Sequence, residues 1–160
     1  SETGTGSDFW YHAVSAAEPD WVILHAPVGD KYGNVLFFPH RQLPEDLDLT
    51  ASRSTKNLIV TVEQIVPHEK VRQLPYLNLI PRFRTTAIVE VPYGAHPFSC
   101  LHVYDQDREH LAHYARAGRD PASFAQYLDR YVYGVRSHDE YLNLIGAATL
   151  ARLRQVGGAL

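Results

Sequence analysis

The segment Tyr93-Gly94-Ala95-His96-Pro97 is the part of the sequence whose residue types and spacing most suggest chemistry. It directly follows an apolar run that predicts a buried strand. Gly94 is predicted to adopt a positive φ, which would let backbone N–H groups face a ligand. Pro97 favours an extended conformation at His96. Two interpretations follow. In one, the segment is a rigid turn whose His96 bonds to the structure. In the other, its N–H groups and His96 face a carboxylate or thioester.

Polar residues also lie at the ends of two other predicted strands. Gly29-Asp30 and Gly33-Asn34 follow the apolar run 20–26, and Glu63 lies in the run 57–66. Ligands of open parallel sheets bind at the C-terminal ends of strands, so we expect Asp30, Asn34 and Glu63 to converge with the 93–97 turn. An unpaired buried carboxylate is costly. Glu63 is therefore interpreted as bonded to backbone or to an arginine, as a site residue, or as a surface residue.

The neighbours Ser99 and Cys100 complete the predicted site region, together with Gly94 and Ala95. Cys100 is the only cysteine, and a nucleophilic role is one interpretation. A small residue packed after a strand is the favoured one. His110 and His113 are three residues apart on a predicted helix, but the sequence lacks the further ligands that a metal site would need. They are interpreted as part of a solvated helix face, and no metal site is predicted.

The predicted elements alternate between strands and helices before a helical tail. The fold class is therefore α/β, with a mostly parallel central sheet, flanking helices and a helical C-terminal tail, in a single domain spanning 1–160. Gly118, Gly134 and the Ser137-His138-Asp139-Glu140 capping box mark helix boundaries in the tail. The expected strands are 20–26, 35–38, 57–66 and 85–91. The expected helices are a short one after Asp8, then 44–56, 106–117, one beginning at Asp120-Pro121, and 138 to about 155. The stretch 67–84 is expected to be mostly irregular.

Composition is that of an ordinary soluble domain. The 160 residues carry a formal net charge of −3, and 45% are hydrophobic. The absence of a basic stripe argues against nucleic acid as a partner. No apolar run approaches the roughly 20 residues needed to cross a bilayer, so no membrane association is expected. A single cysteine fits a cytoplasmic setting. The sequence begins at Ser1 and contains no methionine, so we expect a processed chain, a trimmed chain or a fragment.

Taken together, several blocks resemble a known family. The sequence resembles the C-terminal half of the A (alpha) subunit of class I CoA-transferases, nearest the glutaconate CoA-transferase type. The resemblance covers nearly the whole chain and is carried by five segments in order: GTGSD, PDWVILHAPVGDKYGNVLF, NLIVTVEQIV, VEVPYGAHPFSCLHVYDQD and YVYGVRSHDEYLNLIG.

The resemblance implies a CoA-transferase/NagB-like α/β fold and an A-type chain that pairs with a B-type chain, often as an α2β2 heterotetramer. Such enzymes move CoA between an acyl-CoA and a carboxylic acid through an enzyme-bound thioester, with CoA as substrate and no permanently bound cofactor. The nucleophilic glutamate is expected on the B chain, so Glu63 is not assigned that role. The family also implies a further region before the GTGSD segment. Either another chain supplies that region, or this chain was cut from a longer protein that contains it. Alternatives are a relative acting as hydrolase, C–C lyase or decarboxylase, and a non-catalytic subunit completing a partner's site.

Overall fold

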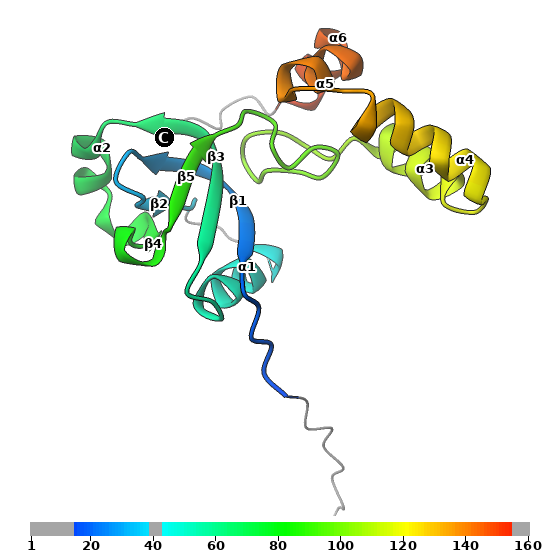
Figure 1. Ribbon diagram of the computed structural model, residues 1–160. Helices are drawn as coiled ribbons and strands as arrows, with labels where there is room; N and C mark the ends of the chain where they lie inside the picture. Colours follow the sequence, from blue (N-terminus) through cyan, green and yellow to red (C-terminus); the bar gives the residue numbers. More distant parts are fainter. Residues whose placement is uncertain (1–14, 39–42, 155–160) are drawn as a thin grey trace, which may run out of the picture.

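The chain folds into a sheet-based lobe followed by a helical arm (Figure 1). The computed structural model describes residues 15–38 and 43–154. Its five-stranded sheet has the order β4-β2-β1-β3-β5. The strands are β1 (Val22–Asp30), β2 (Val35–Leu36), β3 (Leu58–Val66), β4 (Asn78–Ile80) and β5 (Ala87–Glu90). The helices are α1 (Leu43–Arg53), α2 (His68–Gln73), α3 (Arg108–Ala117), α4 (Pro121–Leu128), α5 (His138–Ile145) and α6 (Ala147–Leu153). Short helical turns are η1 (Pro75–Leu77), η2 (Arg82–Arg84) and η3 (Asp129–Tyr133).

The strands β1, β3 and β5 form the parallel part of the sheet that the sequence predicts. β1 pairs with β3 from Val22↔Leu58 to Asp30↔Val66, and β3 pairs with β5. The short strands β2 and β4 add antiparallel pairs on the other side of β1. The stretch 67–84 was expected to be irregular, and this is wrong in part. Its three prolines limit regular structure to short pieces, which include α2 and the edge strand β4.

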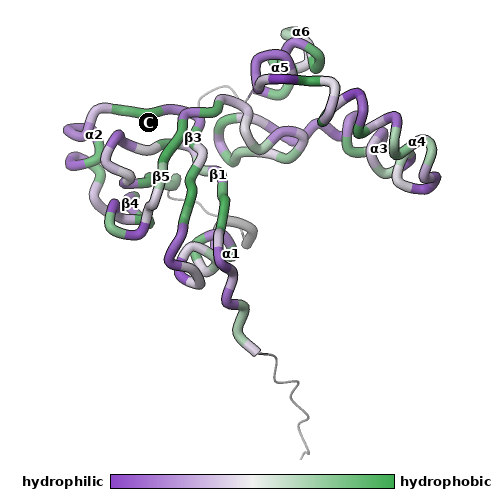
Figure 2. Tube along the Cα trace, in the orientation of Figure 1, coloured by the Kyte–Doolittle hydropathy of each residue, from purple (hydrophilic) through white to green (hydrophobic). Residues whose placement is uncertain are grey.

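Side chains alternate between the two faces of the sheet, as the pleat requires. The even-numbered residues in the first half of β1 and β3 point into the main core, which α1 covers with Leu49; the core comprises Leu24, Ala26, Val35, Phe37, Leu58, Val60, Val62 and Ile80. Figure 2 shows hydrophobic stretches along β1 and β3. The odd-numbered His25, Thr61 and Glu63 therefore lie on the opposite face, where the segment after β5 covers them.

The helices α3, α4 and α5 begin at or close to the positions that the sequence indicates. Asp107, Asp120 and Ser137 cap α3, α4 and α5, each accepting a bond from a backbone N–H in the first turn of its helix. The predicted single helix from 138 to about 155 is wrong. Gly146 adopts a φ of 91°, a left-handed conformation that glycine tolerates, and separates α5 from α6.

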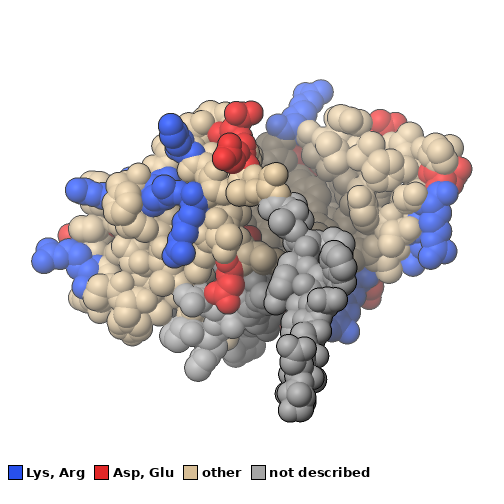
Figure 3. All heavy atoms as spheres, turned by 90° about the horizontal axis from the view of Figure 1, so that it is seen from below, with Lys and Arg blue, Asp and Glu red and all other residues tan. Residues whose placement is uncertain are grey.

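Charged side chains on the face shown in Figure 3 lie in separate groups, and acidic residues are interspersed with basic ones. Among the described residues, no helix combines the length and apolar character needed to span a membrane. The helix expected after Asp8 lies outside the described residues.

The turn between β1 and β2 is organised by the fully buried Asp30. Its carboxylate accepts hydrogen bonds from the Tyr32 and Asn34 N–H groups at 2.9 and 3.0 Å, and from Asn34 Nδ2 at 2.7 Å. His68 Nδ1, from α2, lies 2.7 Å from the same carboxylate. Burial alone would raise the pKa of Asp30, but these hydrogen bonds outweigh it and hold the pKa below its usual value.

We predict that Asp30→Ala lowers the free energy of unfolding by about 3 kcal/mol, because buried donors to a charged acceptor lose their partner. Urea denaturation measures the change. Glu69→Ala, on the exposed side of α2, is the control and should shift the midpoint little. An Asp30→Ala midpoint equal to that of the control would contradict this account of the turn.

Candidate functional site

A pocket of ≈ 590 Å³ lies along the first half of β1, beside α1 and the segment after β5. On this side of β1, the described strand β2 pairs only with Val28 and Gly29, and no other described strand pairs with the first half of β1. Its walls are mainly apolar, with a few polar groups facing inward, which is the usual make-up of a small-molecule site. The lining residues are Ile23, Leu24, His25, Pro27, Phe37, Asp48, Ala95, Phe98, Ser99, Cys100, Leu101 and Gln106.

His25 is the polar centre of this pocket wall. Its ring is held at both nitrogens: Nδ1 lies 2.8 Å from Thr61 Oγ1, and Nε2 lies 2.5 Å from Glu63 Oε1. Thr61 Oγ1 in turn donates to the carbonyl of Leu24 at 3.3 Å. Both ring nitrogens therefore have a side-chain hydrogen-bond partner. The imidazole therefore has one fixed orientation.

Glu63 is held at both oxygens. Oε1 bonds to His25, and Oε2 accepts a hydrogen bond from the Tyr93 N–H at 2.8 Å. Its side chain is only 9% exposed. The Tyr104 hydroxyl lies close by and accepts from the Ala95 N–H at 2.9 Å. Burial, and secondarily the charge of Glu63, raises the pKa of Tyr104 far above its ordinary value. Glu63 is thus bonded to a backbone N–H, as one interpretation has it, and its second partner is His25 and not an arginine.

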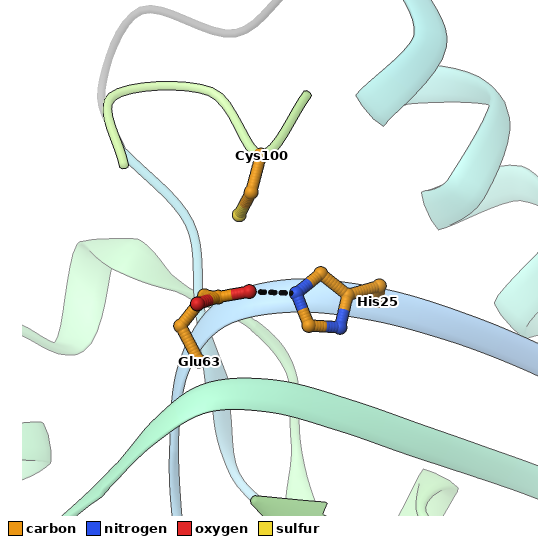
Figure 4. Close-up of side chains that lie close together, drawn as sticks. All are labelled: His25, Glu63 and Cys100. Carbon is orange, nitrogen blue, oxygen red and sulfur yellow. Dashed lines mark hydrogen bonds and ion pairs between the residues drawn. The ribbon is translucent and has the colours of Figure 1, made fainter. Parts of the chain in front are cut away.

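Cys100 faces the His25–Glu63 pair from the segment after β5 (Figure 4). Nitrogen, oxygen and sulfur donor atoms of His25, Glu63 and Cys100 all lie within 4.8 Å of one another. Cys100 is buried, packs with Tyr104 and Leu153, and forms no disulfide. Both ring nitrogens of His25 have other hydrogen-bond partners, Thr61 and Glu63. The geometry is therefore not that of a histidine-activated nucleophile.

Asp48, on α1, also lines the pocket. Burial raises the pKa of its carboxyl group, and the charge of His25 acts in the opposite direction. Asp48, His25 and Cys100 are thus the titratable groups, among the described residues, that line this pocket.

The 93–97 turn is rigid, and its N–H groups bond within the protein. The Gly94, Ala95 and His96 N–H groups donate to Val91 O, Tyr104 Oη and Tyr93 O. The interpretation in which these groups face a ligand is therefore wrong.

The positive φ predicted at Gly94 is also absent, and Tyr93 takes it instead, at 58°. Glycine is required at 94 for another reason. A Cβ there would lie 2.8 Å from both Cε1 and Nδ1 of His25 and 2.8 Å from Val91 O. Gly94 thus permits the turn to approach the His25 ring closely.

His96 belongs to the junction with the helical arm. Its fully buried ring lies 2.6 Å from Tyr141 Oη, on α5, and 3.3 Å from Asp107 Oδ2, the cap of α3. Burial lowers the pKa of His96, although Asp107 opposes the shift. His110 was interpreted as solvated, and this is wrong. It is buried and bonds Tyr127 Oη at 2.8 Å, because α4 packs against this side of α3. Burial lowers its pKa too.

The seven predicted site residues thus fall into three groups. The first group lies at the pocket: Ala95 and Ser99 line it, and Glu63 and Gly94 lie next to His25, which also lines it. His96 lies in the arm junction, and Asp30 and Asn34 bond to each other in the β1–β2 turn. Sequence reasoning missed His25 and Asp48. The only signal was a histidine inside an otherwise apolar strand, at the position that pairs with Thr61.

The chain is similar in sequence and fold to known proteins. No protein-family profile matches the chain. It is 34% identical over 146 residues to the A subunit of the glutaconate CoA-transferase of Acidaminococcus fermentans, which covers 91% of this chain and 44% of the relative. It is 39% identical over 144 residues to an uncharacterised protein of Archaeoglobus fulgidus, covering 89% of this chain and 31% of that protein.

The solved structures agree with the sequence relatives. The crystal structure of the Acidaminococcus fermentans glutaconate CoA-transferase superposes with a TM-score of 0.81 at 33% identity, over 88% of this chain and 43% of that chain. A variant of the decarboxylase AibA/AibB superposes with a TM-score of 0.53 at 32% identity, over 72% of this chain and 41% of that one. The fold is thus that of an α/β class that includes glutaconate CoA-transferase.

Within that class, the chain belongs to the family of CoA-transferase A subunits. It spans less than half the length of the relatives that it matches.

We predict that Gly94→Ala lowers the free energy of unfolding by about 1–3 kcal/mol, because the new methyl group is forced against the His25 ring and Val91 O. Gly118→Ala is the matched control. Its Cβ meets only Tyr114 O, at 3.5 Å, with a φ of −65°, so it should be neutral or slightly stabilising. Denaturant midpoints measure both changes. Equal midpoints for the two variants would contradict the close approach at Gly94.

We also predict that the arm loosens in acid. The folded protein disfavours protonation of His96 and His110, whose pKa values are lowered, whereas the unfolded chain protonates near pH 6.5. Their contribution is therefore complete above about pH 6.5 and is lost as the pH falls through the folded values. Melting temperatures between pH 7.5 and 5 should fall less steeply for His96→Gln than for His113→Gln, an exposed position. Parallel curves would refute the prediction.

Proposed function

We propose that this chain is the A-type subunit of an enzyme that moves CoA between an acyl-CoA and a carboxylic acid. The observation that carries the proposal is the agreement of sequence and fold with glutaconate CoA-transferase over about nine tenths of the chain. The pocket supports it, since an apolar cavity with inward-facing polar groups suits an acyl chain and its thioester. CoA is a substrate in this proposal, with no permanently bound cofactor.

The nucleophilic glutamate belongs on a B-type partner chain. Glu63 does not suit the role, because both oxygens accept hydrogen bonds inside the protein and the side chain is nearly buried. A carboxylate attacking a thioester needs a free oxygen at the reacting carbonyl. The predicted residues on this chain instead form or support one wall of a shared site. Ala95 and Ser99 face the substrate, while Glu63, Gly94, His96, Asp30 and Asn34 hold the surrounding segments in place.

The assembly follows from the same relatives. We infer a hetero-oligomer of A-type and B-type chains, in the cytoplasm, with residues 1–160 as one domain of the A-type part. Its helical arm extends from the sheet lobe (Figure 1).

A second candidate is a related reaction on a CoA thioester. The match to the decarboxylase AibA/AibB favours this function, as does a 31% identity over 131 residues with the cholesterol ring-cleaving hydrolase IpdA subunit of Rhodococcus jostii. Both relatives match over less of this chain than glutaconate CoA-transferase does. A chain without catalytic groups, which only completes a partner's site, would show the same fold.

The test is to trap the covalent intermediate in the purified assembly. We expect incubation with an acyl-CoA, followed by hydroxylamine, to convert one glutamate of the partner chain to a hydroxamate, located by peptide mass spectrometry. Free CoA in place of acyl-CoA is the control and should give none, since no acyl group is available for transfer. Turnover of acyl-CoA without a trapped glutamate would favour the hydrolase or decarboxylase. The absence of both turnover and adduct would leave the non-catalytic subunit.

A further inference from the structure

We propose that His25, Glu63 and Cys100 form a binding site for a divalent cation with affinity for thiolate, such as Zn²⁺. The three side chains come from β1, β3 and the segment after β5 (Figure 4). Their donor atoms lie within 4.8 Å of one another. Imidazole, carboxylate and thiolate are the three protein ligands that zinc binds. The inference rests on these atoms alone and is independent of the proposed transferase function.

The two ligands His25 and Glu63 are oriented as metal ligands are. In metal sites, the atom that does not bind the metal is usually held by a neighbouring hydrogen bond. His25 Nδ1 is hydrogen-bonded to Thr61 Oγ1, and Glu63 Oε2 accepts from the Tyr93 N–H. Both bonds measure 2.8 Å and leave Nε2 and Oε1 facing each other. Each ligand therefore presents one atom to a common point.

A divalent cation suits a buried site with these three ligands. Zinc binds carboxylate and thiolate in their deprotonated forms, together with neutral imidazole, so the protons that these ligand atoms carry are released on binding. The two negative charges of Glu63 and Cys100 then balance the two positive charges of the cation. The bound cluster therefore carries no net charge, which favours it in a low-dielectric interior.

The geometry needs a small adjustment of the side chains. Zinc bonds of 2.0–2.3 Å place tetrahedral ligand atoms roughly 3.5 Å apart. The most distant donor atoms, now within 4.8 Å of one another, must approach by about 1 Å, and Nε2 and Oε1, now 2.5 Å apart, must separate by about 1 Å. His25 and Cys100 both line the ≈ 590 Å³ pocket. The fourth position of the cation would therefore open to the pocket, where water or the carbonyl oxygen or sulfur of a thioester is able to bind. This is the arrangement of a zinc site with three protein ligands.

Cobalt(II) provides the test, because its complexes with thiolate show a charge-transfer band in the near ultraviolet and strong visible bands when tetrahedral. We expect the purified protein, with any partner subunit retained, to bind one equivalent of Co²⁺ per chain with both signatures, and Zn²⁺ to displace it. Cys100 is the only cysteine of this chain, so Cys100→Ser should abolish the charge-transfer band. Thr61→Val, which removes the support of Nδ1, should weaken binding by about 10- to 100-fold.

His113→Ala, on an exposed part of α3, is the matched control and should leave both the spectrum and the affinity unchanged. Thermal melts show whether each variant is folded. The proposal is overturned if the wild-type protein binds no stoichiometric Co²⁺ or Zn²⁺, a result that needs no variant. It is also overturned if the charge-transfer band persists in Cys100→Ser, because the thiolate would then belong to another chain.

Discussion

The hydrogen bond between Glu63 and His25 is the interaction on which the arrangement of this end of the molecule depends. It crosses from β3 to β1 on the face of the sheet opposite α1, where a carboxylate would otherwise be buried without a partner. The remaining oxygen of Glu63 must also be satisfied. It accepts the N–H of Tyr93, and this fixes where the chain turns after β5. A local electrostatic requirement thereby sets the path of a long segment.

That path then determines where the helical arm attaches. Tyr93 Oη donates to the carbonyl of Leu150 at 3.2 Å, and His138 Nε2 bonds the carbonyl of Pro92 at 2.6 Å. Residues Tyr104 and Asp105 pair with the end of α6. The arm is thus held by polar contacts to the segment that Glu63 positions, and a small apolar cluster around Cys100 adds to them. A disturbance at Glu63 is expected to spread into the arm.

The elements were predictable where local signals act, and the site was not. Strand 57–66 and the caps Asp120 and Ser137 follow from apolar runs and capping residues, and the structure contains them. His25 carries no such signal. Its role depends on the register His25↔Thr61 in the sheet and on the return of the chain at Gly94, both of which are tertiary. Likewise, glycine is required at position 94 because the His25 ring, which is far away in the sequence, lies close to it in space. The φ of Gly94 itself does not require glycine.

The occupied oxygens of Glu63 also bear on how chemistry is divided between chains. A carboxylate that is held by His25 and by the Tyr93 N–H positions these groups well but is a poor nucleophile. Attack on a thioester would break its hydrogen bonds to both partners. The same fixation makes it a suitable metal ligand or a stable hydrogen-bond partner for the imidazole of His25. A chain with this site supplies fixed polar groups and a shaped wall, and the group that forms and breaks the thioester must approach from outside it.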